Sequence, residues 1–162
     1  MTDALRLVLD TNVVIDWLVF NDPYMTPLRE RAALGTVVVL THDSALAEFE
    51  RVLGYPELRL IESNRVAALT RYRAQTQWAT MPAGFALNAW QLPAGFPGCR
   101  DRDDDLFLAL AYHSKANALV TRDRALLKMR KRVRKFGVAI WDVQQMIALL
   151  VEDAAASALA SS

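Results

Sequence analysis

The feature that most constrains the fold is an alternation of short apolar runs with longer segments of helical periodicity. The runs are too short for helices and are bounded by turn-forming residues; they occupy residues 5–9, 37–40, 118–121 and 138–140. Segments with helical spacing lie between or after them, at residues 13–20, 43–53, 104–114 and 141–151. Strands separated by helices form a parallel sheet with helices on both faces. We therefore expect an α/β fold with three layers, αβα, around a central, mainly parallel sheet of four to five strands.

The remaining segments complete the predicted domain. Residues 57–78 carry apolar side chains at mostly helical spacing, which predicts one or two amphipathic helices. Residues 79–103 contain three prolines and three glycines, which exclude a long helix but leave room for a short strand. We expect one domain over residues 1–152 and a frayed tail of small residues over 153–162.

Cysteine content and apolar patterning bear on the compartment of the protein. The chain has a single cysteine, Cys99, so it cannot form an internal disulfide, which favours a reducing compartment. Its longest apolar stretch, at residues 13–20, is interrupted by Asp16 and predicts neither a signal peptide nor a transmembrane span. We therefore expect a cytoplasmic protein without membrane contact.

Acidic residues follow the apolar runs. Asp10 comes directly after the first run, Asp123 shortly after the third, and Glu48 lies one turn into the helical segment after the second. A further acidic run leads into the apolar segment at 104–114 and consists of Asp101, Asp103, Asp104 and Asp105. Functional groups of α/β sheets gather beyond the carboxyl ends of the strands. We therefore expect these segments to bring carboxylates to one edge of the sheet.

A carboxylate cluster of this kind suits a divalent cation. No histidine or cysteine accompanies the acids, so the ligand set fits Mg²⁺ or Mn²⁺ and does not fit zinc. Two carboxylates about 4 Å apart repel by roughly 4 kcal/mol at an effective dielectric constant of 20, and a bound cation would remove this repulsion. Such an ion would also lower the pKa of a coordinated water and offset the charge that develops on a phosphoryl group. The pattern therefore points to metal-assisted phosphodiester hydrolysis with one or two ions.

Each of these residues also has a structural interpretation. Asp10 alone could form a turn or cap a helix. The acidic run could stabilise the N-terminus of the helix at 104–114, and Glu48 could be a surface residue of its helix. Asn12 could cap the first helix, or it could hydrogen-bond a metal ligand, and the two roles are compatible.

The acids lie within four short segments, VLDTNV at 8–13, LAEFERVL at 46–53, CRDRDDDLFLA at 99–109 and LVTRD at 119–123. In this order, and over nearly the whole chain, the segments resemble the motifs of the PIN-domain nucleases, and within that family the VapC-like toxins of bacterial toxin–antitoxin modules. The resemblance implies that Asp10, Glu48, Asp105 and Asp123 are metal ligands and catalytic residues, with Asp104 a rival or additional ligand to Asp105. It also implies that Thr121 is a supporting hydroxyl.

The resemblance carries further implications for fold and function. It implies a PIN fold, dependence on Mg²⁺ or Mn²⁺, cleavage of RNA, often a homodimer, and for the toxin group a cognate antitoxin. Two positions depart from the subgroup: Arg102 stands where proline is frequent, and Ala125 stands where an acid or amide is common. Neither departure touches the four acids, but the chemistry of the neighbouring groove is expected to differ.

Positive charge is concentrated in one segment, although the formal net charge of the chain is only +1. Residues 122–135 hold eight basic residues and one acidic residue, a net charge of +7, which leaves −6 for the rest of the chain. This charge would flank the metal site and could follow a phosphate backbone. The candidate RNA contacts are Arg122, Arg124, Lys128 and Arg130. The alternative is a solvated helix face.

The expected function is therefore a metal-dependent ribonuclease, the toxin of a type II toxin–antitoxin module. One alternative is a non-catalytic PIN module that binds RNA or a protein partner. Another is an aspartate-dependent phosphohydrolase, which would need a second acid two residues after Asp10, where Asn12 stands. The aromatic residues Phe85, Trp90 and Phe96 could stack bases, although packing in the core or in a dimer is the more common use of such side chains.

Overall fold

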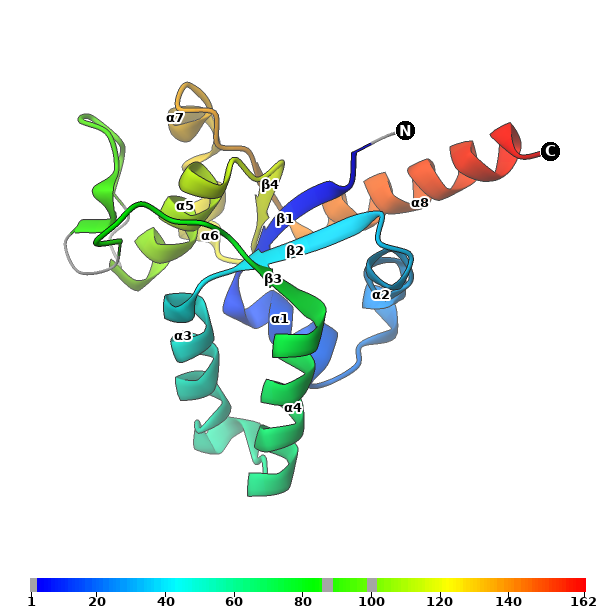
Figure 1. Ribbon diagram of the computed structural model, residues 1–162, viewed down its shortest axis with the longest axis horizontal. Coiled ribbons are helices and arrows are strands. Elements are labelled where there is room, and N and C mark those ends of the chain that lie inside the picture. Colours follow the sequence, from blue (N-terminus) through cyan, green and yellow to red (C-terminus); the bar gives the residue numbers. More distant parts are fainter. Residues whose placement is uncertain (1–2, 86–88, 99–101) are drawn as a thin grey trace.

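The centre of the molecule is a five-stranded sheet in which every neighbouring pair of strands is parallel. It is seen in a computed structural model that describes residues 3–85, 89–98 and 102–162, with the backbone alone at residues 89 and 102–104 (Figure 1). The strands are β1 (Leu5–Leu9), β2 (Val37–Thr41), β3 (Thr76–Trp78), β4 (Ala118–Val120) and β5 (Ile140–Trp141). Their order across the sheet is β3-β2-β1-β4-β5, so the N-terminal strand lies in the middle.

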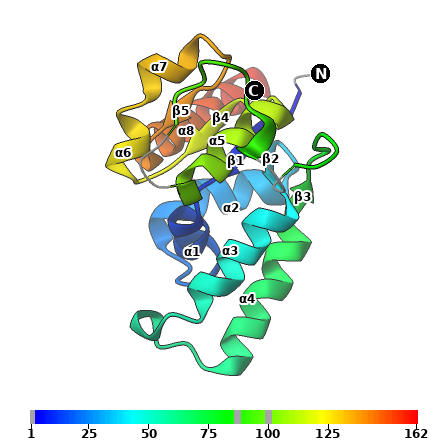
Figure 2. The same cartoon turned by 90° about the vertical axis from the view of Figure 1, so that its left-hand side faces the viewer.

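Helices cover both faces of the sheet, as the sequence predicts. The described helices are α1 (Thr11–Leu18), α2 (Thr26–Ala33), α3 (Asp43–Leu53), α4 (Glu62–Gln75), α5 (Arg102–Ser114), α6 (Arg124–Leu127), α7 (Arg130–Arg134) and α8 (Val143–Ala160). Figures 1 and 2 show α3 and α4 side by side in a pair that extends away from the sheet. The α/β fold with helices on both sides of a parallel sheet is confirmed.

Alternation along β1 separates two apolar cores. Leu7 and Leu9 point into a core shared with α1, α2, α4 and α8, whereas Val8 points into a second core with α5, α6 and α7. Helix α3 contributes to both, because Ala45 joins the second core and Phe49 the first. Since successive side chains of a strand point to opposite faces, a fully buried strand of this kind is apolar on both faces.

Several element boundaries differ from the sequence prediction. Residues 76–78 form β3 rather than the end of a helix, and β3 pairs with β2 through Val39 and Thr76. The basic segment, which was not among the helical segments given above, forms two short helices, α6 and α7. Helix α2 was not predicted; its eight residues include only one buried side chain, Leu28, so its sequence has little helical periodicity.

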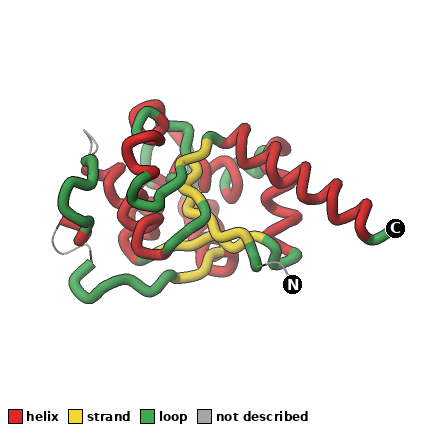
Figure 3. The backbone as a smooth tube through the Cα atoms, turned by 90° about the horizontal axis from the view of Figure 1, so that it is seen from above, coloured by secondary structure: helices red, strands yellow, loops and turns green. Residues whose placement is uncertain are grey.

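Helix α8 runs through the segment that was expected to be a frayed tail. It begins with a capping box, in which Asp142 accepts from the Gln145 backbone N–H and Gln145 accepts from that of Asp142, and it continues to Ala160. The alanine-rich composition of residues 154–160 explains the continuation, because alanine has the highest intrinsic helix propensity. All residues from 151 onward are exposed, and this end projects from the body of the protein (Figure 3).

By length and composition alone, α8 is the one helix in the described residues that could cross a membrane. Its first half belongs to the core, however, because Val143, Met146, Ile147 and Leu150 are buried there. Withdrawal of these side chains from the first core would expose the apolar surface of α2 that they cover. The position of α8 is therefore that of a structural helix of the domain.

We predict that truncation of a buried side chain of α8 destabilises the whole domain. Met146→Ala is expected to lower the free energy of unfolding by about 2–5 kcal/mol, because Met146 is fully buried and its truncation leaves a cavity. Leu159→Ala in the same helix, where the side chain is 77% exposed, is the control and should stay within about 0.5 kcal/mol of the wild type. Urea denaturation followed by circular dichroism measures both; equal effects would show that α8 is not part of the core.

Candidate functional site

The order of the strands determines where polar residues meet. From β1 the chain crosses to β2 on one side, and β4 pairs on the other side of β1, so the direction of winding changes at the β1–β4 pair. In open α/β sheets, ligands bind beyond the carboxyl ends of the strands at such a point. Asp10 directly follows β1, and Thr121 and Asp123 follow β4.

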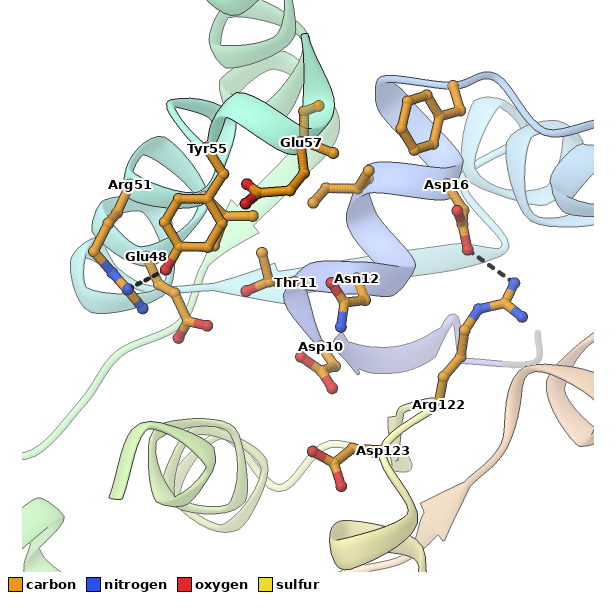
Figure 4. Close-up of a pocket in the computed structure, with 14 residues that line it drawn as sticks. Asp10, Thr11, Asn12, Asp16, Glu48, Arg51, Tyr55, Glu57, Arg122 and Asp123 are labelled. Atoms are coloured by element: carbon orange, nitrogen blue, oxygen red, sulfur yellow. Dashed lines mark hydrogen bonds and ion pairs between the residues drawn. The ribbon is translucent and has the colours of Figure 1, made fainter. Parts of the chain in front are cut away.

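A pocket of about 710 Å³ opens at this edge of the sheet (Figure 4). Three of the predicted acids, Asp10, Glu48 and Asp123, line it from three separate segments of the chain. The remaining lining residues are Thr11, Asn12, Ile15, Asp16, Phe20, Arg51, Val52, Tyr55, Glu57, Leu58 and Arg122. The fold thus brings together residues more than a hundred positions apart in the sequence.

Asp10 is held at the base of the pocket by the two central strands. Its backbone N–H donates to the Val120 carbonyl at 3.0 Å, and its carboxylate Oδ2 accepts from the Thr121 hydroxyl at 2.7 Å. The same hydroxyl oxygen accepts from the backbone N–H of Asp123 at 2.9 Å. Thr121 therefore connects the two acids.

Burial raises the pKa of Asp10 above its ordinary value of 3.8. Desolvation is the largest cause, since Asp10 is only 6% exposed, and the nearby charge of Asp123 adds to it. The Thr121 hydroxyl and the backbone amides of Thr11 and Asn12 act in the opposite direction without offsetting burial. Ionised Asp10 is therefore unfavourable in this pocket and would be stabilised by a cation.

Asp123 has a structural role as well as a place in the pocket. It is the N-cap of α6, and its Oδ1 accepts from the backbone N–H of Ala125 at 2.7 Å. This capping bond orients the carboxylate at the start of the helix, facing the carboxylate of Asp10 (Figure 4).

Glu48 reaches the pocket from the middle of α3. The buried Tyr72 hydroxyl lies close enough for the negative charge of Glu48 to raise its pKa, although desolvation is the larger cause, and the pKa of Tyr72 reaches about 12. Tyr72 is hydrogen-bonded to Thr41 at the end of β2. The Tyr72–Thr41 hydrogen bond therefore anchors α4 to β2, the strand that leads into the helix carrying Glu48.

The other predicted site residues have different positions. Asp105 is partly buried on the first turns of α5. It is not among the described residues that line the pocket. The side chain of Asp104 lies outside the described residues, as do residues 99–101. Asn12 lines the pocket but does not cap α1, because the cap position is occupied by Asp10 and Asn12 lies inside the first turn.

The donors around the pocket fit a hydrated Mg²⁺ or Mn²⁺. In the part of the chain that the structure describes, no three histidine, cysteine or acidic side chains are placed to hold one ion directly. Mg²⁺ commonly retains several waters and binds proteins through one or two carboxylates, which here would be Asp10 and Asp123. Glu48 lies across the pocket from these two carboxylates (Figure 4).

A buried hydroxyl supports the presence of ordered water or a ligand at this position. Thr11 Oγ1 is buried and has no hydrogen-bond partner among the described residues. Thr11 lies on the wall of the pocket between Asp10 and Glu48 (Figure 4). Buried polar groups are nearly always paired, so this hydroxyl fits a water molecule of a hydrated ion.

The basic segment divides into residues near the pocket and a residue turned into the protein. Arg122 lines the pocket and forms an ion pair with Asp16 of α1 at 2.9 Å, so any phosphate contact of its guanidinium would be made from a position that Asp16 helps to set. Arg124 and Lys128 are exposed at the two ends of α6. Arg130 instead donates to the Ile140 carbonyl at 3.0 Å and pairs with Asp142 at 3.3 Å, which joins α7 to β5 and α8.

Sequence reasoning missed several pocket residues. Asp16 and Tyr55 line the pocket from outside the four motif segments, and Arg51, although it lies within LAEFERVL, looks like an ordinary surface residue of its helix. The one usable signal is spacing, because Arg51 follows Glu48 by three residues and therefore lies on the same face of α3. Arg51 donates to the Tyr55 hydroxyl, and its guanidinium lies 5.7 Å from the centre of the Tyr55 ring.

Comparison with known protein families identifies the family of the chain. The family model described as PIN domain matches residues 6–125, which include Asp10, Glu48, Asp105 and Asp123. A comparison with curated proteins gives no match.

We predict that removal of the Asp10 charge stabilises the metal-free protein. Since the folded-state pKa of Asp10 is raised, the folded state disfavours the ionised carboxylate at neutral pH, and Asp10→Asn should increase the free energy of unfolding. The gain should shrink as the pH falls through the folded-state pKa and vanish below about 3.8, where the carboxyl is protonated in both states. Chemical denaturation in EDTA across pH 3–8 tests this expectation, with the exposed Glu152→Gln as control. A destabilised Asp10→Asn protein at pH 7 would contradict it.

Proposed function

The chain belongs to the PIN domain family, whose members are generally nucleases, and from this premise we propose that it is a metal-dependent ribonuclease that hydrolyses RNA phosphodiester bonds. The observation that carries the proposal is the convergence of Asp10, Glu48 and Asp123 on one pocket at the carboxyl edge of the sheet. In this proposal the four motif acids Asp10, Glu48, Asp105 and Asp123 are the catalytic and metal-binding residues, with Asp104 beside Asp105.

In this proposal the residues of the pocket have different roles in hydrolysis. Mg²⁺ or Mn²⁺, as one or two ions, would lower the pKa of a bound water and offset the charge developing on the scissile phosphoryl group. Asp10 and Asp123 would hold the cation through their negative charge, and Thr121 fixes both residues in place. Glu48 lies across the pocket from them and would orient the attacking water. Attack of this water on phosphorus with cleavage of the P–O3′ bond gives one product with a 5′-phosphate, as the family resemblance implies, and one with a 3′-hydroxyl.

The substrate is held by positive charge next to the acids. Arg122 is on the rim of the pocket, and α6 begins directly after Asp123, so Arg124 and Lys128 extend the basic surface from the metal site. A phosphate backbone passing over the pocket is attracted to these side chains, while the acids themselves would repel it without the cation. Arg130 is not included, because its guanidinium is used within the protein.

We extend the proposal to the biological setting. The VapC-like motifs support a role as the toxin of a type II toxin–antitoxin module, with a cognate antitoxin as partner and a homodimer as the active assembly. The single cysteine supports a cytoplasmic location. Inspection of the adjoining reading frame for a small DNA-binding protein tests the module, and light scattering at several concentrations tests the dimer.

Replacement of the acids should abolish cleavage. Glu48→Gln is expected to lower Mn²⁺-dependent cleavage of single-stranded RNA by at least about 100-fold, because the uncharged amide no longer orients the water. Asp10→Asn should give no measurable cleavage. Glu50→Gln is the matched control, since Glu50 is exposed on the same helix and does not line the pocket.

The assay uses purified protein and end-labelled RNA with Mn²⁺ or EDTA, and denaturation curves establish that each variant is folded. Cleavage in EDTA, or unchanged cleavage by Asp10→Asn, would overturn the proposal. RNA binding without any cleavage at millimolar Mn²⁺ would instead favour the non-catalytic module.

The basic surface should determine the salt dependence of RNA binding. If Arg124 contacts a phosphate, Arg124→Ala reduces the slope of log affinity against log salt concentration by about 0.7, the value for one phosphate contact on a single strand. Arg132→Ala is the control, because Arg132 is exposed on α7, beyond the helix that starts at the pocket. Fluorescence anisotropy between 50 and 300 mM KCl gives both slopes; equal slopes for the two variants would remove Arg124 from the site.

A further inference from the structure

A second, smaller pocket adjoins the acidic pocket on the far side of Glu48. It has a volume of about 250 Å³ and is lined by Ser44, Ala47, Glu48, Arg51, Trp90 and Leu106. We propose that this pocket binds a single nucleobase of the RNA, on the nucleotide next to the phosphate held over the acids, with the base stacked on Trp90. The inference rests on the proposed function for the identity of the ligand.

The two pockets are continuous through one face of α3. Glu48 and Arg51 line both of them. Ala47 and Glu48 follow Ser44 by three and four residues, and Arg51 follows them by four and three, so the four residues form one stripe along the helix. A strand of RNA with its phosphate in the first pocket therefore has an adjacent base at the entrance of the second.

Trp90 is held over this pocket by a turn with an unusual backbone conformation. Trp90 and Gln91 have φ angles of +56° and +50°, in the left-handed region that bulky residues rarely adopt. The Trp90 carbonyl is hydrogen-bonded to His113 Nε2 at 3.0 Å, and Gln91 Nε2 donates to the Ala83 carbonyl at 2.6 Å. The surrounding contacts thus keep an otherwise disfavoured conformation that presents the indole ring to the pocket.

The walls of the pocket match the flat face and the polar edge of a nucleobase. The partly exposed Trp90 ring offers a flat apolar surface and Leu106 is buried at 4% exposure, which suits the π-face of a base. Ser44 offers a hydroxyl to its polar edge, and Arg51, whose guanidinium donates to the Tyr55 hydroxyl, lines the same wall. The volume lies below the roughly 300 Å³ at which pockets for drug-sized ligands begin, so it suits one base rather than a whole nucleotide.

The structure distinguishes Trp90 from the two other aromatic residues of its segment. Phe85 is 7% exposed and lies between the rings of His42 and His113, with ring centres 4.9 Å and 5.7 Å away. Phe96 packs on Tyr112 and Phe136. All three pack in or against the second core, and the centre of the Trp90 ring lies 5.2 Å from that of Phe85. Trp90 differs from the other two in that it also lines the pocket that shares Glu48 with the acidic pocket.

The test is a binding cycle that separates base contacts from backbone contacts. All proteins carry Asp10→Asn so that RNA is not cleaved, and the probes are fluorescein-labelled hexaadenylate and the same ribose-phosphate hexamer without bases. Trp90→Leu removes the flat ring but retains apolar volume, and Trp90→Phe retains a ring. Trp78→Ala is the control, because Trp78 is 38% exposed and lines neither pocket.

If a base stacks on Trp90, Trp90→Leu weakens hexaadenylate binding by about tenfold, leaves the base-free hexamer unchanged, and Trp90→Phe restores most of the affinity. Ala47→Leu, which fills the pocket from the opposite wall, should reproduce the selective loss and does not depend on the folding of the Trp90 variants. Unchanged binding of hexaadenylate, or an equal loss for both probes, would overturn the inference.

A parallel cleavage assay with the wild type separates this inference from the proposed function. Cleavage without a selective effect of Trp90 leaves the ribonuclease in place and removes the base pocket. A selective effect without cleavage retains the base pocket and removes the ribonuclease.

Discussion

The hydrogen bond from the Thr121 hydroxyl to the carboxylate of Asp10 is the contact on which the site depends. It joins the ends of β1 and β4, two strands whose sequences are separated by most of the chain, and its oxygen also accepts from the backbone of Asp123. A negative charge buried at the end of a central strand is unfavourable, and this bond compensates only part of the desolvation. The pocket is therefore arranged around a carboxylate that the fold alone does not satisfy.

The parallel sheet explains why such a carboxylate can be retained. Every strand delivers its carboxyl end to the same edge, so acids that follow β1 and β4 become neighbours without any local sequence relation. The apolar residues of β1 are divided between two cores, which hold the strand from both faces while its end remains accessible from the pocket. The residues within β1 thus pack the two cores, while Asp10 at its carboxyl end lines the pocket.

Sequence reasoning was most successful where one physical rule dominated. The limits of α3 at Asp43 and Leu53 agree with the prediction, because the segment begins after a clear strand and ends before Gly54 and Pro56. Asp10, Glu48 and Asp123 could be predicted to converge because strand ends in a parallel sheet share an edge. By contrast, β3 consists of Thr76, Gln77 and Trp78, which continue a helical pattern and become a strand only through pairing with β2. The Asp16–Arg122 ion pair and the pocket under Trp90 arise from contacts between distant segments, which a linear pattern does not reveal.

The central position of β1 has a consequence for synthesis of the protein. During synthesis β1 emerges before both of its partners and must wait for the one on its second side until β4 has emerged, because β1 lies between β2 and β4. Long-range pairing of this kind slows folding and leaves an unpaired strand edge in partial chains. It also means that a nascent or prematurely terminated chain lacking β4 has neither the hydroxyl that positions Asp10 nor the carboxylate of Asp123. The order of the strands therefore delays assembly of the acidic pocket until β4 and Asp123 have been synthesised.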